Sequence, residues 1–169
     1  MMDEANAQHP KETGGVLLGY QDETKFDVVV RAATGPGPNA IHERSTFVPD
    51  HDYHRNEVAR IYSASDRQWS YVGDWHTHPE QPAAMSTTDR RTLRRIARSE
   101  RARVARPIML IMGQRGSPVE VGTWSAPRSP WLVKAWQYDN REPPGNGLTF
   151  GLGSRFRMCA VLAFTPGGS

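Results

Sequence analysis

Two histidines separated by one residue stand in the middle of the chain, and a serine and an aspartate follow them. His76 and His78 lie in a stretch rich in aromatic and β-branched residues, which is typical of a strand. Alternate residues of a strand point to the same face, so the two imidazoles should lie side by side. Asp89 falls in the first turn of an expected helix, where the returning chain could bring its carboxylate to them. Two histidines and one carboxylate leave a tetrahedral zinc ion one open position, which is typical of a catalytic site that makes hydroxide available at neutral pH.

Each of these residues also has an ordinary structural explanation. Polar histidines on a strand are mostly satisfied by backbone groups or by water. Ser86 and Asp89 have the spacing of a capping box, in which both side chains bond to backbone N–H groups at the start of a helix. We expect the two roles to compete for Asp89, because one short carboxylate would serve both poorly. The spacing alone leaves both interpretations open.

Other enzymes that use a His-x-His pair do not match this chain. A metallo-β-lactamase site would need a further Asp-His pair after His78, where Pro79 and Glu80 stand. A cupin would need an acid shortly after the histidine pair, which Glu80 could provide, but it would also need an all-β pattern. An amidohydrolase barrel needs about 250 residues. Asp74 shares the expected face of the strand with both histidines, and it is either a partner of a metal ligand or an ordinary hydrogen-bonded or solvated acid.

The elements that must position these side chains form an α/β domain with a central mixed sheet flanked by helices. Apolar and β-branched runs predict strands at residues 16–18, 26–33, 45–49, 69–78, 107–112 and 119–124. A polar turn at residues 22–25 predicts that the first two strands form a hairpin. We expect Pro79 to end the strand that carries the histidines and residues 80–85 to form a loop.

Two helices are predicted between the strands. Asp50 is a good N-cap for a helix that ends at residues 63–66, and its apolar residues recur with near-helical spacing. Ser86 or Thr87 caps the second helix, which we expect to run to about Arg103. The second helix therefore begins at the candidate metal ligand Asp89.

The composition limits the class of protein. The chain has 169 residues, of which 37% are hydrophobic and 23% charged, and this is the size of about one domain. No apolar run approaches the roughly 18 residues that span a bilayer, and the first residues lack the apolar core of a secretory signal. The single cysteine, Cys159, excludes an internal disulfide, so we expect a cytoplasmic protein in which Cys159 is an ordinary residue of an apolar patch. We predict a catalytic domain over residues 1–140 and a C-terminal extension of unknown order over 141–169.

The net charge is only +3, but it is distributed unevenly. Residues 90–106 contain eight arginines and one acid, Glu100. This segment raises the hypothesis of a nucleic-acid-binding protein from a different functional class. A solvated face of an amphipathic helix explains the segment better, because few aromatic residues stand between the arginines to stack on bases. An acidic protein partner is equally compatible with the arginines.

The motif His-Thr-His, seven residues and Ser-Thr-Thr-Asp resembles the signature of the JAMM metalloproteases, also called MPN+ or JAB. The stretch from Glu12 to Gly19, Glu-Thr-Gly-Gly-Val-Leu-Leu-Gly, is similar to the segment that carries the glutamate of that family. The resemblance covers residues 10–125 and implies the MPN/JAB fold, which is similar to that of cytidine deaminases. The family usually has a strand and a helix before its glutamate, whereas eleven residues precede Glu12 here.

The resemblance implies a role for each residue of the motif. His76, His78 and Asp89 would bind one Zn²⁺ per chain. Glu12 would hold the attacking water, act as the general base and pass the proton to the leaving amine. Ser86 would donate a hydrogen bond to the carbonyl oxygen as this oxygen becomes negative. A catalytically inactive MPN scaffold typically lacks the zinc ligands, and all of them are present here.

Within the family, the chain is most similar to a bacterial branch found beside E1- and E2-like proteins, including the JAB peptidase of cyclic-oligonucleotide antiphage (CBASS) operons. The segments that carry this similarity include residues 35–40, 47–50 and 73–79. The similarity implies a zinc isopeptidase that separates a ubiquitin-like or E1/E2-conjugated bacterial protein from its target, in antiphage defence. E1- and E2-like proteins would then be its partners, whereas nucleic acid and membranes would not. A peptidase that matures a ubiquitin-like or sulfur-carrier precursor is the alternative within the same chemistry.

Overall fold

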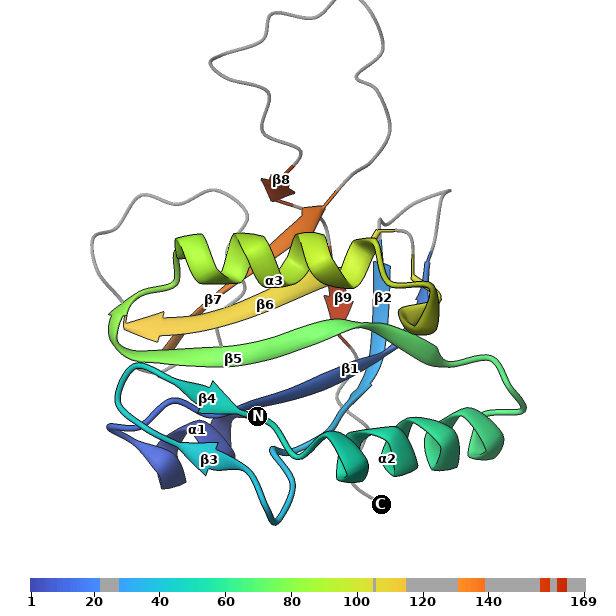
Figure 1. The fold of residues 1–169 in the computed structure, drawn as a ribbon, viewed down its shortest axis with the longest axis horizontal. Coiled ribbons are helices and arrows are strands. Elements are labelled where there is room, and N and C mark those ends of the chain that lie inside the picture. The colour runs from blue at the N-terminus through green and yellow to red at the C-terminus, as the bar shows by residue number, and fades with distance from the viewer. Residues whose placement is uncertain (22–27, 105, 115–130, 139–155, 159–160, 164–169) are drawn as a thin grey trace, which may run out of the picture.

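A seven-stranded mixed sheet forms the centre of the computed structural model, which describes residues 1–21, 28–104, 106–114, 131–138, 156–158 and 161–163. The strands follow the order β8-β7-β6-β5-β1-β2-β9 (Figure 1). Their bounds are β1 (Gly14–Gln21), β2 (Val28–Ala33), β5 (Ser70–Pro82), β6 (Ile108–Gln114), β7 (Trp131–Tyr138), β8 (Phe156–Met158) and β9 (Val161–Ala163). Two pairs, β5 with β6 and β2 with β9, are parallel, and the other pairs are antiparallel. The predicted α/β class with a mixed sheet is confirmed.

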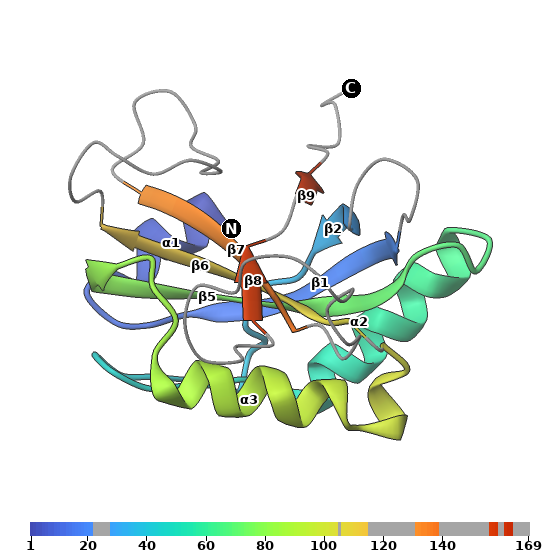
Figure 2. The ribbon, with the colours of Figure 1, turned by 90° about the horizontal axis from the view of Figure 1, so that it is seen from above.

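Helices cover both faces of the sheet. Figure 2 shows α2 (His51–Ala64) and α3 (Thr87–Ala97) on one face and the short α1 (Met2–Gln8) on the other. A small hairpin of β3 (Ile41–His42) and β4 (Phe47–Val48) lies on the side of α2 and α3. None of the helices in the described ranges is long and apolar enough to cross a membrane.

The core has one apolar cluster on each face of the sheet. Alternate residues of β6 supply both clusters, as the two-residue period of a strand requires. Leu110 packs in the cluster that includes Trp75 and Ala5 of α1. Met109 and Ile111 pack in the other cluster, against Leu93 of α3. Trp75 and Leu93 are almost completely buried, so the strand that carries the histidines and the helix that carries Asp89 are both anchored in the core.

The first helix prediction is confirmed, and the second holds at its start. Asp50 caps α2 by accepting a hydrogen bond from the backbone N–H of Tyr53 at 3.0 Å. Ser86 caps α3, but this helix ends at Ala97 rather than near Arg103. The apolar spacing of α3 does not continue, because Glu100 and Arg101 stand where core residues would be needed, and both are exposed. A short 3-10 turn, η1 (Glu100–Ala102), follows, and Arg103 has a positive φ of 51°.

The expectation that Pro79 ends the histidine strand is wrong. β5 continues to Pro82, so part of the predicted loop is strand. The pairing of β5 with β6 is irregular between His78 and Pro82, and the pairing of β5 with β1 ends at His76. Proline has no backbone N–H to donate. It is tolerated at this position because neither neighbouring strand pairs regularly with β5 there.

Several predicted elements extend to or lie in parts of the chain outside the described residues. The turn at 22–25, the edge strand at 119–124 and Cys159 are among them, whereas the hairpin pairing of β1 with β2 is confirmed. Residues 141–169 contain β8 and β9, which pair with β7 and β2 in the main sheet. The division into residues 1–140 and 141–169 stays a prediction.

Candidate metal centre

His76 and His78 lie on one face of β5, in the middle of the sheet. β5 pairs with both β1 and β6 at His76, and with β6 at His78. The Nε2 atoms of the two rings are 3.0 Å apart, and the rings meet edge to face. Their side chains are only 12% and 9% exposed. The strand therefore presents two aligned imidazole nitrogens at the edge of solvent.

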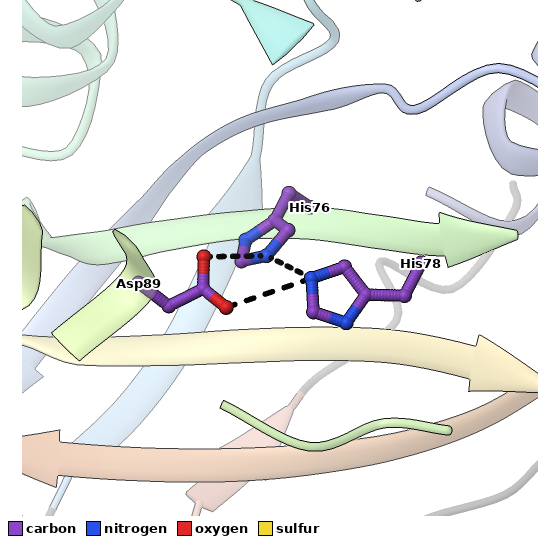
Figure 3. A group of neighbouring side chains, drawn as sticks. All are labelled: His76, His78 and Asp89. Atoms are coloured by element: carbon purple, nitrogen blue, oxygen red, sulfur yellow. Dashed lines mark hydrogen bonds and ion pairs between the residues drawn. The ribbon is translucent and has the colours of Figure 1, made fainter. Parts of the chain in front are cut away.

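Asp89 reaches the same point from the first turn of α3. Its Oδ1 lies 3.3 Å from Nε2 of His76, and its Oδ2 lies 3.5 Å from Nε2 of His78 (Figure 3). The same carboxylate completes a capping box, because Oδ2 accepts a hydrogen bond from the backbone N–H of Ser86 at 2.7 Å. The expected competition for Asp89 is not seen, since the side chain makes both sets of contacts. The hydrogen bond from Ser86 instead aims the carboxylate at the histidines.

The three side chains fit a small divalent cation. Each offers one ligand atom, and these atoms all lie within 4.8 Å of one another. Ligands of a tetrahedral zinc ion stand 2.0–2.1 Å from the metal, which places any two of them about 3.3 Å apart. The two Nε2 atoms are 3.0 Å apart, and they lie 3.3 and 3.5 Å from the two different oxygens of the Asp89 carboxylate, so each separation is close to this spacing. The donor set of two imidazoles and one carboxylate is also the set that catalytic zinc uses.

The electrostatics of the cluster favour the ligand forms of these side chains. Burial raises the pKa of the Asp89 carboxyl, but hydrogen bonds and charge from His76 and hydrogen bonds from Ser86 outweigh it and hold the pKa well below its usual value. Burial, with the nearby His76, lowers the pKa of His78. At neutral pH the site therefore contains a carboxylate beside a neutral imidazole, and both are forms that bind metal.

Glu12 lies at the edge of this cluster, where the chain enters β1. Gly14 pairs with His76 across the two strands, and the backbone N–H of Thr77 donates to the carbonyl oxygen of Thr13 at 2.8 Å. Continuing this antiparallel register places Glu12 level with His78. Burial raises the pKa of the Glu12 carboxyl, an effect that His76 opposes and the Asp89 carboxylate reinforces. Glu12 is thus a half-buried acid within electrostatic range of the candidate ligands.

The β3–β4 hairpin holds the backbone of Glu12 from both sides. The N–H of Glu12 donates to the carbonyl oxygen of Glu43 at 2.7 Å. The ring Nδ1 of His42 lies 2.9 Å from the carbonyl oxygen of Glu12 and donates to it. Phe47 packs against His42 and lies where a side chain on Gly14 would stand. The sequence did not single out His42, because nothing local indicates that the hairpin meets a segment thirty residues away.

The remaining predicted residues take varied positions. Ser86 is exposed, and its Oγ accepts a hydrogen bond from the backbone N–H of Asp89 at 3.1 Å, so its own hydroxyl proton can point outward. Asp74 accepts a hydrogen bond from the hydroxyl of Tyr71 at 2.8 Å, and burial raises its pKa. Charge on His76 opposes this rise in the Asp74 pKa, but the hydrogen bond of the Asp74 carboxylate goes to Tyr71 rather than to His76 or His78. His54, another histidine, bonds the carbonyl oxygen of Gly35 at 3.0 Å.

Comparison with known proteins places the chain among peptidases. The family described as prokaryotic homologues of the JAB domain matches residues 1–128. A probable metalloprotease of Sinorhizobium fredii is 39% identical over 137 residues, which are 80% of this chain and 76% of that protein. A CD-NTase/cGAS isopeptidase of Enterobacter hormaechei is 30% identical over 135 residues, 77% of this chain and 69% of that protein. The solution structure of a Desulfitobacterium hafniense protein superposes with a TM-score of 0.54 over 98% of this chain and 87% of that one, at 17% identity, which supports the fold alone.

Proposed function

The chain belongs to the prokaryotic JAB family of metalloproteases, and from this premise we propose that it is a zinc isopeptidase that removes a conjugated protein from its target. One observation carries the proposal: ligand atoms of His76, His78 and Asp89 lie within 4.8 Å of one another, beside the half-buried acid Glu12. We assign the three cluster residues as zinc ligands, with one ion per chain. When bound, zinc would supply Lewis acidity toward a carbonyl group and toward water.

The chain's own residues provide the proton transfers of amide hydrolysis. Glu12 accepts a proton from water as the water oxygen attacks the carbonyl carbon. Its raised pKa makes it a stronger base than an ordinary glutamate, provided that it is ionised at the working pH. Ser86 donates its hydroxyl proton in a hydrogen bond to the carbonyl oxygen as negative charge develops there. The C–N bond then breaks, Glu12 passes its proton to the leaving nitrogen, and the products are a carboxylate and an amine.

Relatives support an isopeptide bond as the target. The Enterobacter and Vibrio cholerae relatives are named CD-NTase/cGAS isopeptidases and are 30% and 31% identical to this chain. By analogy, the substrate is a ubiquitin-like or E1/E2-conjugated bacterial protein, the partners are E1- and E2-like proteins, and the setting is antiphage defence. Maturation of a ubiquitin-like precursor is the second candidate, because the same residues would hydrolyse a linear peptide bond.

Cleavage of two matched substrates tests the proposal. One substrate carries a ubiquitin-like protein on a lysine side chain, and the other carries the same protein as a linear fusion. We expect the full chain to cleave the isopeptide-linked substrate faster, and to lose activity by at least about a hundredfold in Glu12→Gln or after chelation. Glu43→Gln is the matched control, because Glu43 is an exposed acid of the hairpin next to Glu12.

Two results would decide against parts of the proposal. Cleavage that survives both Glu12→Gln and the chelator would exclude the metallopeptidase mechanism. Faster cleavage of the linear fusion would replace deconjugation by precursor maturation and leave the roles of Glu12 and the ligands in place.

A further inference from the structure

The outer face of α3 carries a shallow hollow lined by arginines. The hollow has a volume of about 450 Å³, and its lining consists of Arg91, Arg94, Arg95, Arg98 and Ser99. All four arginine side chains are exposed. The opposite side of the helix carries the buried Leu93, which packs against the sheet. Among the described residues, the lining of the hollow therefore carries four cations and no acid, on a helix that the core holds in place.

The arrangement differs from that of an ordinary solvated helix. On α2, Arg55 pairs with Asp52 and Arg60 pairs with Glu57, each three residues apart. On α3, no acid stands three or four positions from any of the arginines that line the hollow. Arg91 and Arg95 are instead four residues apart, and like charges at this spacing destabilise a helix. A bound anion would relieve this repulsion.

The helix dipole accounts for only part of the pattern. Cations near the C-terminus of a helix are favourable, and Arg94 and Arg95 lie in the last turn of α3. Arg91 lies closer to the N-terminus, where a cation gains nothing from the dipole. Helix stability therefore does not explain the full positive charge of this face of α3.

The position of the face indicates the kind of anion. α3 begins with Ser86 and Asp89 at the metal centre, and the rise of a helix places Arg98 only about 14 Å farther along its axis than Asp89. A folded protein whose chain enters the site is about twice as wide as that distance. α3 contains no aromatic residue on which a base could stack. These features favour a protein over a nucleic acid.

We propose that the arginine face of α3 binds an acidic surface of the protein substrate and so contributes to substrate selection. Arginine forms paired hydrogen bonds with carboxylates, which suits a surface of aspartate and glutamate side chains. The identity of the partner as substrate rests on the proposed function. The binding of acidic protein groups does not, and it can be measured without any cleavage.

Fluorescence anisotropy with a short labelled polyglutamate peptide tests the binding, with a mixed-sequence DNA duplex of equal charge as the competing probe. The variant Arg91→Glu/Arg95→Glu/Arg98→Glu should weaken peptide binding by at least about tenfold. The matched control Arg55→Glu/Arg60→Glu/Arg67→Glu changes the net charge equally on exposed arginines elsewhere and should stay within about twofold of the wild type. The glutamine versions of both triple variants, which avoid new acidic groups on a helix, should follow the same order.

Equal weakening by both triple variants, or by neither, would overturn the proposal. DNA binding that is tighter than peptide binding and depends on the same arginines would make the face a nucleic-acid surface and also overturn it.

With a cleavable protein substrate, the α3 variant should raise KM about tenfold and leave kcat unchanged. A chain that binds the peptide but cleaves nothing would count against the proposed function and leave the acidic-surface binding in place.

Discussion

At the scale of single residues, Asp89 joins helix formation to the metal centre. Its carboxylate accepts the hydrogen bond of the Ser86 backbone and faces both histidine rings. The capping box fixes the side chain before any ligand arrives, so little conformational freedom remains to be lost on binding. The spacing between Ser86 and Asp89 therefore lets one carboxylate cap the helix and face both histidine rings.

Ser86 provides a test that separates its two roles. Ser86→Ala should lower the stability of the fold by about 1 kcal/mol, because the backbone N–H of Asp89 loses its acceptor. It should also reduce kcat by about a hundredfold, because a donor to the developing oxyanion is lost. Ser86→Thr keeps a hydroxyl and should retain most of both. Thermal unfolding and steady-state kinetics of the two variants measure the effects, and full activity in a destabilised Ser86→Ala would leave Ser86 with the capping role alone.

The residues of the cluster were predictable to different degrees. Alternation along a strand placed His76 and His78 side by side, and the helix start placed Asp89 near them. Glu12 followed only from the family resemblance, because its distance from His76 in the chain is bridged by strand pairing that no local pattern reveals. His42 was not predicted at all, since its role depends on a hairpin that crosses to the start of β1.

At the scale of elements, the β3–β4 hairpin acts as a clamp on the segment that carries Glu12. His42→Ala removes the donor to the carbonyl oxygen of Glu12 and should lower kcat about tenfold with unchanged zinc content, because Glu12 is less well positioned. His42→Asn keeps an N–H donor and should recover part of the loss. His51→Ala, at an exposed histidine of α2, is the control. A fall in zinc content, or no rescue by asparagine, would contradict a positioning role.

The start of α2 provides a prediction of pH dependence. The backbone N–H of Tyr53 lowers the pKa of the Asp50 carboxyl, and hydrogen bonds from Asn39 lower it further. A lowered pKa stabilises the fold above the unfolded-state value of about 3.9, and this contribution disappears as the pH falls through the lower folded-state value. Asp50→Asn should therefore lower the melting temperature at about pH 6, and the difference from the wild type should shrink as the pH falls toward 3.

The exposed acid Asp52 of the same helix serves as the control, and Asp52→Asn should show a smaller effect at neutral pH. A difference between wild type and Asp50→Asn that grows on acidification would contradict the assigned direction of the pKa shift.

Element boundaries followed the sequence where a local signal existed and departed from it where packing decided. Asp50 and Ser86 both begin helices, as their capping chemistry predicts. The strand with the histidines continues through Pro79 because neither neighbouring strand pairs regularly with β5 at this residue, so no backbone N–H is needed there. The end of α3 depends on which residues the sheet can bury, and arginine-rich composition alone does not indicate it.

At the scale of the whole molecule, the site lies where the central strand of a mixed sheet meets the start of a helix packed on it. β5 is bonded on both sides and Leu93 anchors α3, so the candidate ligands come from two elements with little freedom to separate. The order β1, β2, β4, α2, β5, α3 and β6 was readable from the sequence, whereas α1 and β7 were not predicted. The participation of β8 and β9 at the two sides of the sheet was not readable either, because three-residue strands carry no periodic signal.

The zinc content of the purified full chain tests most directly whether His76, His78 and Asp89 hold a catalytic metal. After reconstitution with zinc and removal of excess metal, mass spectrometry of the intact protein should find about one zinc ion per wild-type chain. His78→Ala and Asp89→Ala should lose it, whereas Asp52→Ala, an exposed acid outside the cluster, should retain it. A wild-type chain that binds no zinc, or variants that bind it as well as the wild type, would contradict the assignment.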